Sequence, residues 1–468
     1  MDKRIFIGVL AFFSWIITLN AADLRLPAIL GSHMVLQQQS EVAIWGWAKA
    51  GDKVSVKPEW SKDAQYIVAD KDGTWKLQIQ TPEAGGKYQL TISSDTTIIL
   101  EDILIGEVWV CSGQSNMEMP VKGFLSQPVN GSNKAILQSN NPNIRLFKVA
   151  REMSTSPLND VKGKWVVASP EEVAEFSATG YFFGRYLQGV IQAPVGLIQS
   201  CWGGTKAEAW TDRPTLASDF PEFDLDLKET DINKNSPTVL YNAMINPIIK
   251  YRIKGVIWYQ GEGNRNNPEQ YTRLFPGMIG NWRNLWNQGD FPFYFVQIAP
   301  YKYDTKVNSA FLREAQLKTM LNTPNTGMAV TMDIGNYSTI HPPEKEMVGE
   351  RLAYWALAKT YGIQGSGYCG PTYKSMEVKE GKAVLAFDFA DLGLTSFDQN
   401  LEGFEVAGSD KVFHKAGAAI NRNNVIVWSE SVDTPVAVRY CWENFVVGTL
   451  FNTAGLPASS FRTDDWEE

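Results

Sequence analysis

Hydrophobic and polar positions follow different patterns in three successive parts of the chain. In residues 23–101, short runs are alternating or continuously apolar, and turn dipeptides separate them. The runs are Glu41–Trp47, Lys53–Lys57 and Tyr88–Ile92, and the turns are Gly51-Asp52, Asp72-Gly73 and Gly85-Gly86. Short strands with turns at this spacing are typical of a β-sandwich.

The middle part, residues 102–362, alternates strands with helices. Near-continuous apolar runs predict strands buried on both faces at Glu107–Cys111, Val195–Cys201, Gly255–Tyr259, Phe293–Ile298 and Met328–Ile334. Helical spacing predicts helices at Thr179–Ile191, Pro268–Trp286, Phe311–Asn322 and Pro343–Tyr361. This alternation implies an α/β domain with a mainly parallel sheet, whose ligands bind beyond the carboxyl ends of the strands.

After residue 362 the pattern returns to strands such as Asn424–Trp428 and Val436–Tyr440. A chain of 468 residues is longer than one hydrophobic core usually serves, so two or three domains are expected. We predict a β-sandwich module at 23–101, an α/β domain at 102–362 and a second β module at 363–468.

The first residues resemble an export signal. Lys3 and Arg4 precede an apolar run, Ile5–Leu19, which small residues follow. The run is shorter than the roughly 20 residues of a membrane span, so residues 1–22 are predicted to be a Sec signal peptide. We expect no integral membrane association and a periplasmic or extracellular protein. No Cys follows the run, so a lipid anchor is not expected.

Composition narrows the chemistry. The formal net charge is -8, which argues against nucleic acid or an anionic membrane as a partner. The four cysteines have no Cys-x-x-Cys spacing, so we expect no structural zinc and no metal cofactor. Cys111 and Cys201 lie in apolar runs and are predicted to be buried thiols. For Cys369 and Cys441, a disulfide remains an alternative.

Polar residues follow the predicted strands of the α/β domain. Ser115 follows the first strand, but Met117 stands where the G-x-S-x-G elbow requires glycine, so that motif does not apply. Gln260, Glu262 and Asn264 follow a later strand. In a parallel sheet these ends share one rim, where a nucleophile, amides and carboxylates form the inventory of an acyl-transfer site.

The positions of the histidines narrow the choice of a general base most strongly. Of three histidines, only His341 falls in the α/β domain, whereas His33 and His414 fall in the β modules. A serine nucleophile needs a base with a pKa near neutrality, which predicts Ser115 as nucleophile and His341 as base. Glu262, ahead of Asp333, is the candidate to orient His341.

The oxyanion of such a reaction needs hydrogen-bond donors. The candidates are the Ser115 amide, the amide of Gly180 or Gly203, and the side chains of Gln114, Gln260 or Asn264. Lys122, Arg213 and Arg265 are loop cations that would favour an anionic sugar.

Several segments together resemble the sialate O-acetylesterases, which are SGNH-type hydrolases similar to acetylxylan esterases. They are LPAILGSHMVLQ, VAIWGWA, GEVWVCSGQSNMEMPV, LIQSCWGGTKAEAWT, SPTVLYNAMINPI, GVIWYQGEGN, IHPPEKEMVGERLA and ASSFRTDDW. The resemblance implies a flavodoxin-like three-layer core flanked by β-sandwich elements, no metal, and removal of acetyl groups from sugars. It makes Ser115 the nucleophile and His341 the base, with Gln260 and the Ser115 amide as oxyanion donors.

The chain departs from that family pattern before the histidine. Asn336 and Thr339 stand where many relatives carry acidic residues. This shifts the orienting role to Glu262, with Asp333 in reserve, or to a Ser–His dyad oriented by backbone.

The sequence therefore predicts an exported carbohydrate O-acetylesterase without cofactor, acting on O-acetylated sialic acids. The alternatives are an acetylxylan or other polysaccharide esterase, a glycosidase using Glu262 and Asp333, and a non-catalytic glycan-binding protein.

Overall fold

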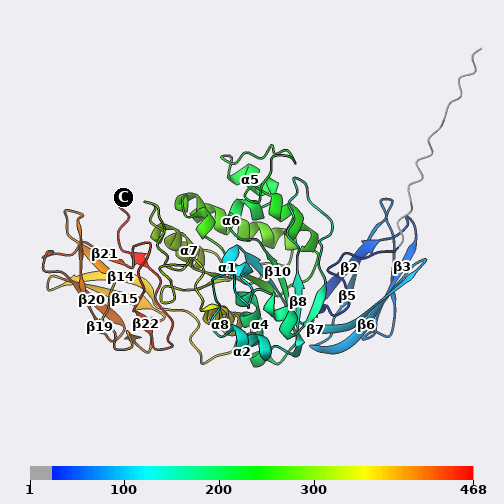
Figure 1. Ribbon diagram of the computed structural model, residues 1–468, viewed down its shortest axis with the longest axis horizontal. Coiled ribbons are helices and arrows are strands. Elements are labelled where there is room, and N and C mark those ends of the chain that lie inside the picture. Colours follow the sequence, from blue (N-terminus) through cyan, green and yellow to red (C-terminus); the bar gives the residue numbers. More distant parts are fainter. Residues whose placement is uncertain (1–23, 467–468) are drawn as a thin grey trace, which may run out of the picture.

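The computed structural model describes residues 24–466, so the predicted signal peptide lies outside the described residues. Three parts lie in a row, with a β module at each end of a central α/β domain (Figure 1). This confirms the predicted α/β core with a mainly parallel sheet, flanked by β modules. Within residues 24–466, no helix is long and apolar enough to cross a membrane.

The central sheet has the order β13-β12-β11-β7-β10-β8-β9, with only β9 antiparallel to its neighbour. Its strands are β7 (Thr97–Gly113), β8 (Asn141–Lys148), β9 (Trp165–Ala168), β10 (Val195–Cys201), β11 (Gly255–Tyr259), β12 (Phe293–Val296) and β13 (Thr326–Ala329). β7 lies between β10 and β11, so the residue that follows it emerges near the middle of the sheet.

Two predicted strands are too long. The run Phe293–Ile298 ends as a strand at Val296. The apolar run Met328–Ile334 ends as a strand at Ala329. Beyond it, the Thr331 hydroxyl donates to the Gln297 carbonyl at 2.7 Å, and Asp333 turns to a helix to pair with Arg351.

Helices cover both faces of the sheet. Successive residues of each strand point to opposite faces, so they belong to two different hydrophobic cores. Val108 and Val110 of β7 belong to the core on the side of α6 (Pro268–Trp286), and Trp109 belongs to the core on the side of α4 (Ala178–Ile191). The other long helices are α7 (Ala310–Asn322) and α8 (Lys345–Trp355).

Helix α8 was expected to run from Pro343 to Tyr361. It begins at Lys345 and continues after Trp355 as a π-helical turn, η5 (Ala356–Thr360). The shorter helices of the domain are α1 (Ser115–Glu118), α2 (Ser132–Leu137), α3 (Pro170–Ala174), η1 (Ala207–Trp210), α5 (Arg213–Asp219), η2 (Tyr241–Ile245), η3 (Asn246–Ile248) and η4 (Glu262–Asn264).

The N-terminal module shares a strand with the central sheet. Its own strands are β1 (Val35–Gln37), β2 (Glu41–Trp47), β3 (Lys53–Pro58), β4 (Gln65–Val68), β5 (Thr74–Gln80) and β6 (Gly85–Ser93). The first half of β7 pairs with β6, and its second half pairs with β10 and β11. The boundary predicted at residue 101 therefore falls inside a continuous strand.

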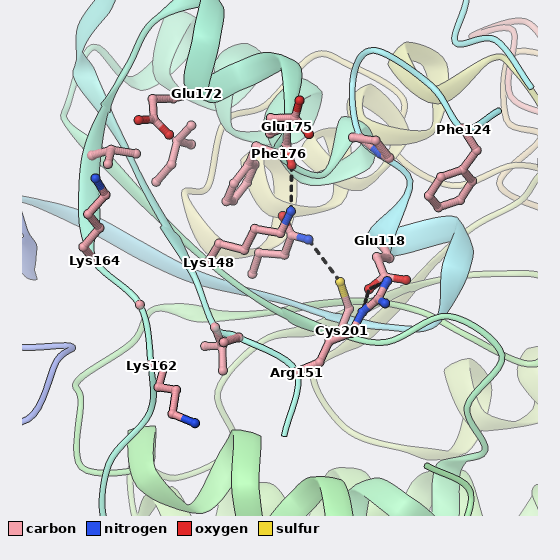
Figure 2. Close-up of a pocket in the computed structure, with 17 residues that line it drawn as sticks. Glu118, Phe124, Lys148, Arg151, Lys162, Lys164, Glu172, Glu175, Phe176 and Cys201 are labelled. Atoms are coloured by element: carbon pink, nitrogen blue, oxygen red, sulfur yellow. Dashed lines mark hydrogen bonds and ion pairs between the residues drawn. The ribbon is translucent and has the colours of Figure 1, made fainter. Parts of the chain in front are cut away.

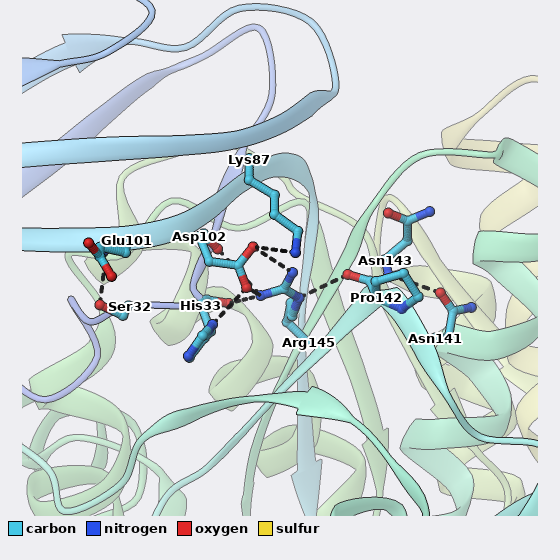
Figure 3. Close-up of polar contacts among 9 residues, drawn as sticks. All are labelled: Ser32, His33, Lys87, Glu101, Asp102, Asn141, Pro142, Asn143 and Arg145. Atoms are coloured by element: carbon cyan, nitrogen blue, oxygen red, sulfur yellow. Dashed lines mark hydrogen bonds and ion pairs between the residues drawn. The ribbon is translucent and has the colours of Figure 1, made fainter.

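A polar network braces this junction (Figure 3). Asp102 of β7 accepts hydrogen bonds from Arg145 Nη1 at 2.7 Å and Nη2 at 3.2 Å, and it meets His33 Nδ1 at 2.7 Å. Lys87 lies 3.4 Å from the same carboxylate. Burial alone would raise the pKa of Asp102, but the hydrogen bonds from Arg145 and His33 outweigh it and lower that pKa to about 2.

The C-terminal module consists of small antiparallel sheets that pack against α7. Its strands are β14 (Thr372–Lys379), β15 (Lys382–Asp388), β16 (Leu394–Thr395), β17 (Phe404–Ala407), β18 (Phe413–Lys415), β19 (Gly417–Asn421), β20 (Asn424–Trp428), β21 (Ala437–Tyr440), β22 (Phe451–Asn452) and β23 (Phe461–Arg462). The fully buried Arg313 of α7 donates to the Cys441 carbonyl at 3.0 Å and to the Glu443 carbonyl at 2.7 Å.

The four cysteines are buried free thiols. This confirms the prediction for Cys111 and Cys201. Cys369 and Cys441 are not bridged, so the alternative of a disulfide is wrong.

Candidate active site

Ser115 stands where the chain leaves the sheet between β10 and β11. Gly113 makes this exit with φ +132, and a Cβ there would lie 2.2 Å from the Tyr259 carbonyl oxygen. Only glycine fits such a close approach. The Gln114 carbonyl then accepts from the amides of Met117 and Glu118 at 2.9 Å, which closes α1 with the half-buried Ser115 at its start.

The end of β11 packs beside this turn. Gln114 Oε1 accepts from the Gly263 amide at 3.1 Å and from the Gly261 amide at 3.4 Å. Gln260 is fully buried, and its Nε2 donates to the Thr205 carbonyl at 3.1 Å and to Asn264 Oδ1 at 2.7 Å. Both Gln260 donors are therefore occupied and not free for an oxyanion.

The other amide candidates are also engaged. The Gly180 amide donates to Ser177 Oγ at 2.9 Å, and the Gly203 amide donates to Glu118 Oε2 at 2.8 Å. Asn264 Nδ2 donates to Glu208 Oε2 at 2.8 Å. Within residues 24–466, the Ser115 amide and Gln114 Nε2 make no hydrogen bond, so these two predicted donors are free.

Asn116 joins the serine turn to the loop of His341. Its Nδ2 donates to the Ile340 carbonyl, the residue before His341, at 3.1 Å. Lys345 Nζ donates to Asn116 Oδ1 at 2.7 Å and to the Pro342 carbonyl at 2.8 Å. The residues beside Ser115 and on both sides of His341 are thus hydrogen-bonded to one another.

Glu262 contacts the serine side of this junction. Its Oε1 accepts from Asn116 Nδ2 at 2.7 Å, and its buried Oε2 has no partner in the described part of the chain. Burial raises the pKa of Glu262 and lowers the pKa of Lys345 to about 7. Asn116 therefore lies between the buried carboxyl group of Glu262 and the buried amine of Lys345. No role was predicted for Asn116 or Lys345 from the sequence.

Asp333, the reserve candidate, faces elsewhere. Its carboxylate pairs with Arg351 of α8 through contacts of 2.7 and 2.6 Å. This bidentate pair anchors the loop before His341 to a helix. Within residues 24–466, neither Asp333 nor Glu262 makes a hydrogen bond with His341.

The atom that meets His341 Nδ1 is Oε1 of Gln127. The Phe124 ring packs edge-on against the imidazole, with centroids 5.4 Å apart. His341 Nε2 is buried and has no partner in the described chain. Burial, and next the charge of Lys345, lower the pKa of His341 to about 4, so the imidazole is neutral at pH 7.

Sequence reasoning missed Gln127 because it lies in an irregular segment, where no period assigns it a direction. Lys345 left a weak signal. It is a cation in the first turn of a helix, where the macrodipole disfavours positive charge.

A cavity of about 810 Å³ lies next to α1 (Figure 2), and neither Ser115 nor His341 is among the residues that line it. Glu118 and Phe124 line it, so one wall belongs to the helix that Ser115 begins and another touches His341. Apolar side chains form much of the remaining wall: Leu146, Val149, Val166 and Phe176. Such a cavity has the size of one that binds a small organic ligand.

Four cations line the same cavity: Lys148, Arg151, Lys162 and Lys164. Arg151 pairs with Glu118 at 2.6 Å, and Lys162 pairs with Glu152 at 2.9 Å. Lys148 donates only to a backbone carbonyl, that of Glu175, and Lys164 has no partner within residues 24–466. Three carboxylates, Glu118, Glu172 and Glu175, line the same cavity, so its lining carries one more cation than carboxylate.

The loop cations named from the sequence are engaged with neighbours. Lys122 forms an ion pair with Glu175 at 2.5 Å, and Arg213 forms one with Asp226 at 2.9 Å. The Arg265 guanidinium lies over the Tyr303 ring, 4.5 Å from its centroid. Among residues 24–466, no cluster of His, Cys, Asp and Glu could hold a metal ion.

The fold and the groups at its strand ends define an SGNH-type carbohydrate esterase, a carboxylic-ester hydrolase. Residues 105–357 match the family described as carbohydrate esterase, sialic acid-specific acetylesterase. The chain belongs to this family.

Relatives extend over nearly the whole chain. The mouse sialate O-acetylesterase is 30% identical, covering 89% of this chain and 89% of its own length. The human sialate O-acetylesterase is 29% identical, covering 93% and 90%. A carbohydrate acetylesterase from Xanthomonas citri has a solved structure with a TM-score of 0.87 and 36% identity, covering 95% of this chain and 100% of that one.

Proposed function

We propose that this carbohydrate O-acetylesterase acts on O-acetylated sialic acids through a Ser115–His341 acyl-enzyme mechanism. The observation that carries the mechanism is the Asn116 bridge. It ties the residue after Ser115 to the residue before His341. The Nε2 atom of His341 makes no hydrogen bond in the described chain. An unengaged acceptor nitrogen on a loop that is hydrogen-bonded to the serine turn suits a general base.

In the proposed reaction, His341 Nε2 takes the proton of Ser115 Oγ as this oxygen attacks the acetyl carbonyl carbon. The Ser115 amide and Gln114 Nε2 donate to the developing oxyanion. Collapse of the tetrahedral intermediate breaks the bond to the sugar oxygen, which leaves with the proton from His341. Water, deprotonated by the same imidazole, then attacks the acyl-serine. The acyl–Oγ bond breaks, the imidazolium returns its proton to Ser115 Oγ, and acetate is released.

Glu262 and Lys345 support this arrangement without touching the reacting atoms. Both hold Asn116, from its Nδ2 and its Oδ1 respectively. The rival glycosidase mechanism would need Asp333 as a free carboxyl group, but Arg351 engages both oxygens of that group.

The decisive variant is Ser115→Ala, assayed with an aryl acetate. Loss of the nucleophile should lower kcat by at least about 10³-fold, with unchanged thermal unfolding, since triad members act as a unit. Turnover close to that of the parent chain would refute the mechanism.

The choice of sialic acid as substrate rests on the mammalian relatives and on the charge of the cavity. Sialic acids carry a carboxylate that xylan sugars lack, and the cavity next to α1 is lined by four cations and three carboxylates, with Lys164 making no ion pair within residues 24–466. We expect kcat/KM to be higher for O-acetylated sialic acid than for acetylated xylan. The reverse order would assign the chain to polysaccharide deacetylation.

Charge reversal at the cavity tests the same point. Lys164→Glu should lower kcat/KM for the anionic sugar up to about fivefold, since an exposed ion pair contributes at most about 1 kcal/mol. Its activity on a neutral aryl acetate should not change. Lys71→Glu, on an exposed turn of the N-terminal module, is the matched control for net charge.

We also propose export, directed by residues 1–22. Fractionation of cells that express the full chain should place esterase activity in the periplasm or medium. Deletion of residues 2–22 should retain that activity in the cytoplasm, and an unchanged distribution would exclude this role.

A further inference from the structure

We propose that the side-chain amide oxygen of Gln127, rather than a carboxylate, orients His341 as the general base. This inference rests on the proposed function and names a positioning residue for it. Gln127 comes from an irregular segment between α1 and α2, far from His341 in sequence.

The Gln127 oxygen has two donors. It accepts from His341 Nδ1, and the Thr339 hydroxyl lies 3.4 Å from it as a second donor. Thr339 Oγ1 itself accepts from the His341 backbone amide at 3.2 Å, so its hydrogen remains available to Gln127. Side chain and backbone of His341 are thus held through one oxygen.

This arrangement selects the tautomer. An amide oxygen has no proton to donate, so the Nδ1 that faces it must carry the hydrogen. The lone pair of the neutral imidazole is then on Nε2, which has no other partner in residues 24–466. That is the nitrogen which a serine base needs open.

The turn that carries Gln127 is well fixed. The amides and carbonyls of Phe124 and Gln127 bond to each other in both directions at 3.0 Å. Gly123 before them has φ +86, and a Cβ there would lie 2.5 Å from the Gln127 carbonyl oxygen. Since Phe124 packs edge-on against the imidazole, the same turn fixes the ring plane and the Nδ1 hydrogen bond.

The carboxylates that could compete are committed elsewhere. Glu262 reaches Asn116, and Asp333 reaches Arg351. The charged side chain that acts on His341 is Lys345, which is positive when protonated. An uncharged orienter fixes direction, but it does not add the negative charge that stabilises an imidazolium.

Two substitutions of Gln127 separate the loss of its hydrogen-bond acceptor from a change in side-chain volume. Gln127→Leu keeps a similar volume and removes the acceptor, so kcat on an aryl acetate should fall about 100-fold with little change in KM. Gln127→Glu restores an acceptor and should keep kcat at pH 8 near the parent value. Its carboxylate should also move the acidic limb of the kcat/KM profile upward by about one to three pH units.

Ring nitrogen NMR gives a readout independent of rate. The chain has three histidines, so ¹⁵N-labelled imidazoles can be assigned by substitution. His341 in the parent chain should show a protonated Nδ1 and an unprotonated Nε2. Gln127→Leu should give a tautomer mixture, while Leu125→Ala, a 94% exposed residue of the same turn, should change neither the spectrum nor kcat.

Full activity of Gln127→Leu, or loss of activity in Gln127→Glu equal to that in Gln127→Leu, would overturn this role for the amide oxygen. An active Ser115→Ala variant would instead refute the proposed mechanism itself. The two failures are therefore distinguishable in one assay.

Discussion

Two histidines of this chain direct Nδ1 at a side-chain oxygen, and they differ in everything around that contact. His33 meets the Asp102 carboxylate at 2.7 Å, at the junction with the N-terminal module (Figure 3). His341 meets the uncharged oxygen of Gln127, at the carboxyl ends of the parallel strands. The first pair resembles half of a catalytic triad more closely than the second.

The difference lies in what the partner atoms do. The Asp102 charge is compensated by Arg145, whose side chain is fully buried, and His33 is 45% exposed beside it. His341 is half-buried, its Nε2 has no partner in the described chain, and Asn116 ties its loop to the serine turn. A histidine–carboxylate pair is thus a structural brace here, while the candidate base is distinguished by its position and its free nitrogen.

The largest expected effect separates the two histidines by rate. His341→Ala should lower kcat on an aryl acetate by about 10²–10⁴-fold, the contribution of a general base. His33→Ala should leave kcat unchanged, because no group at the junction reaches Ser115. Steady-state kinetics with purified, folded variants measures both rates. Equal losses of kcat in the two variants would mean that His341 is not distinguished from His33 as the base.

The second largest effect is expected on stability, at the junction between the N-terminal module and the central sheet. Asp102→Asn leaves Arg145 buried without its charge partner, which should reduce the free energy of unfolding by about 3–5 kcal/mol. Urea denaturation measures this change, and kcat of the folded variant should persist. Asp388→Asn is the matched control. Its ion pair with Lys374 is 52% and 61% exposed, so its removal should cost no more than about 1 kcal/mol.

The junction also shows what the pattern of the chain does and does not predict. β10, β11 and α6 have the predicted bounds, because apolar runs there end at polar loops. β8 was not predicted, because Arg145 and Lys148 interrupt its apolar run. Arg145 is buried in a strand only because Asp102 of β7 compensates its charge, and such a pairing is invisible to a local pattern.

The same limit applies to the candidate site. Ser115, Gln114 and His341 were identifiable as candidates from the sequence, because strand ends converge in a parallel sheet and histidines are few. Gln127 was not, since its role depends on how an irregular turn packs against a loop far along the chain. The engagement of Gln260 and Gly203 by neighbours likewise depends on side-chain hydrogen bonds rather than on spacing.

The two regions should also respond differently to acid. The folded-state pKa of His341, about 4, lies below its ordinary 6.5, so the unfolded chain binds this proton first. The contribution of neutral His341 to the free energy of unfolding is therefore fully present above pH 6.5, and it is lost as the pH falls through about 4. Asp102, with a pKa of about 2 against 3.8, keeps its contribution above pH 3.8 and loses it as the pH falls through 2.

The smallest expected effect concerns the pH limit of activity. Because the proposed mechanism needs neutral His341, kcat/KM should decline only as the pH falls toward about 4. Lys345→Met removes the positive charge that helps to depress the His341 pKa, so its acidic limb should move upward, though burial keeps it below 6.5. Lys359→Met, an exposed lysine of the following helical turn, should leave the limb in place. A profile with its limb at 6.5 in the parent chain would mean that the imidazole is more open to solvent than its packing against Phe124 implies.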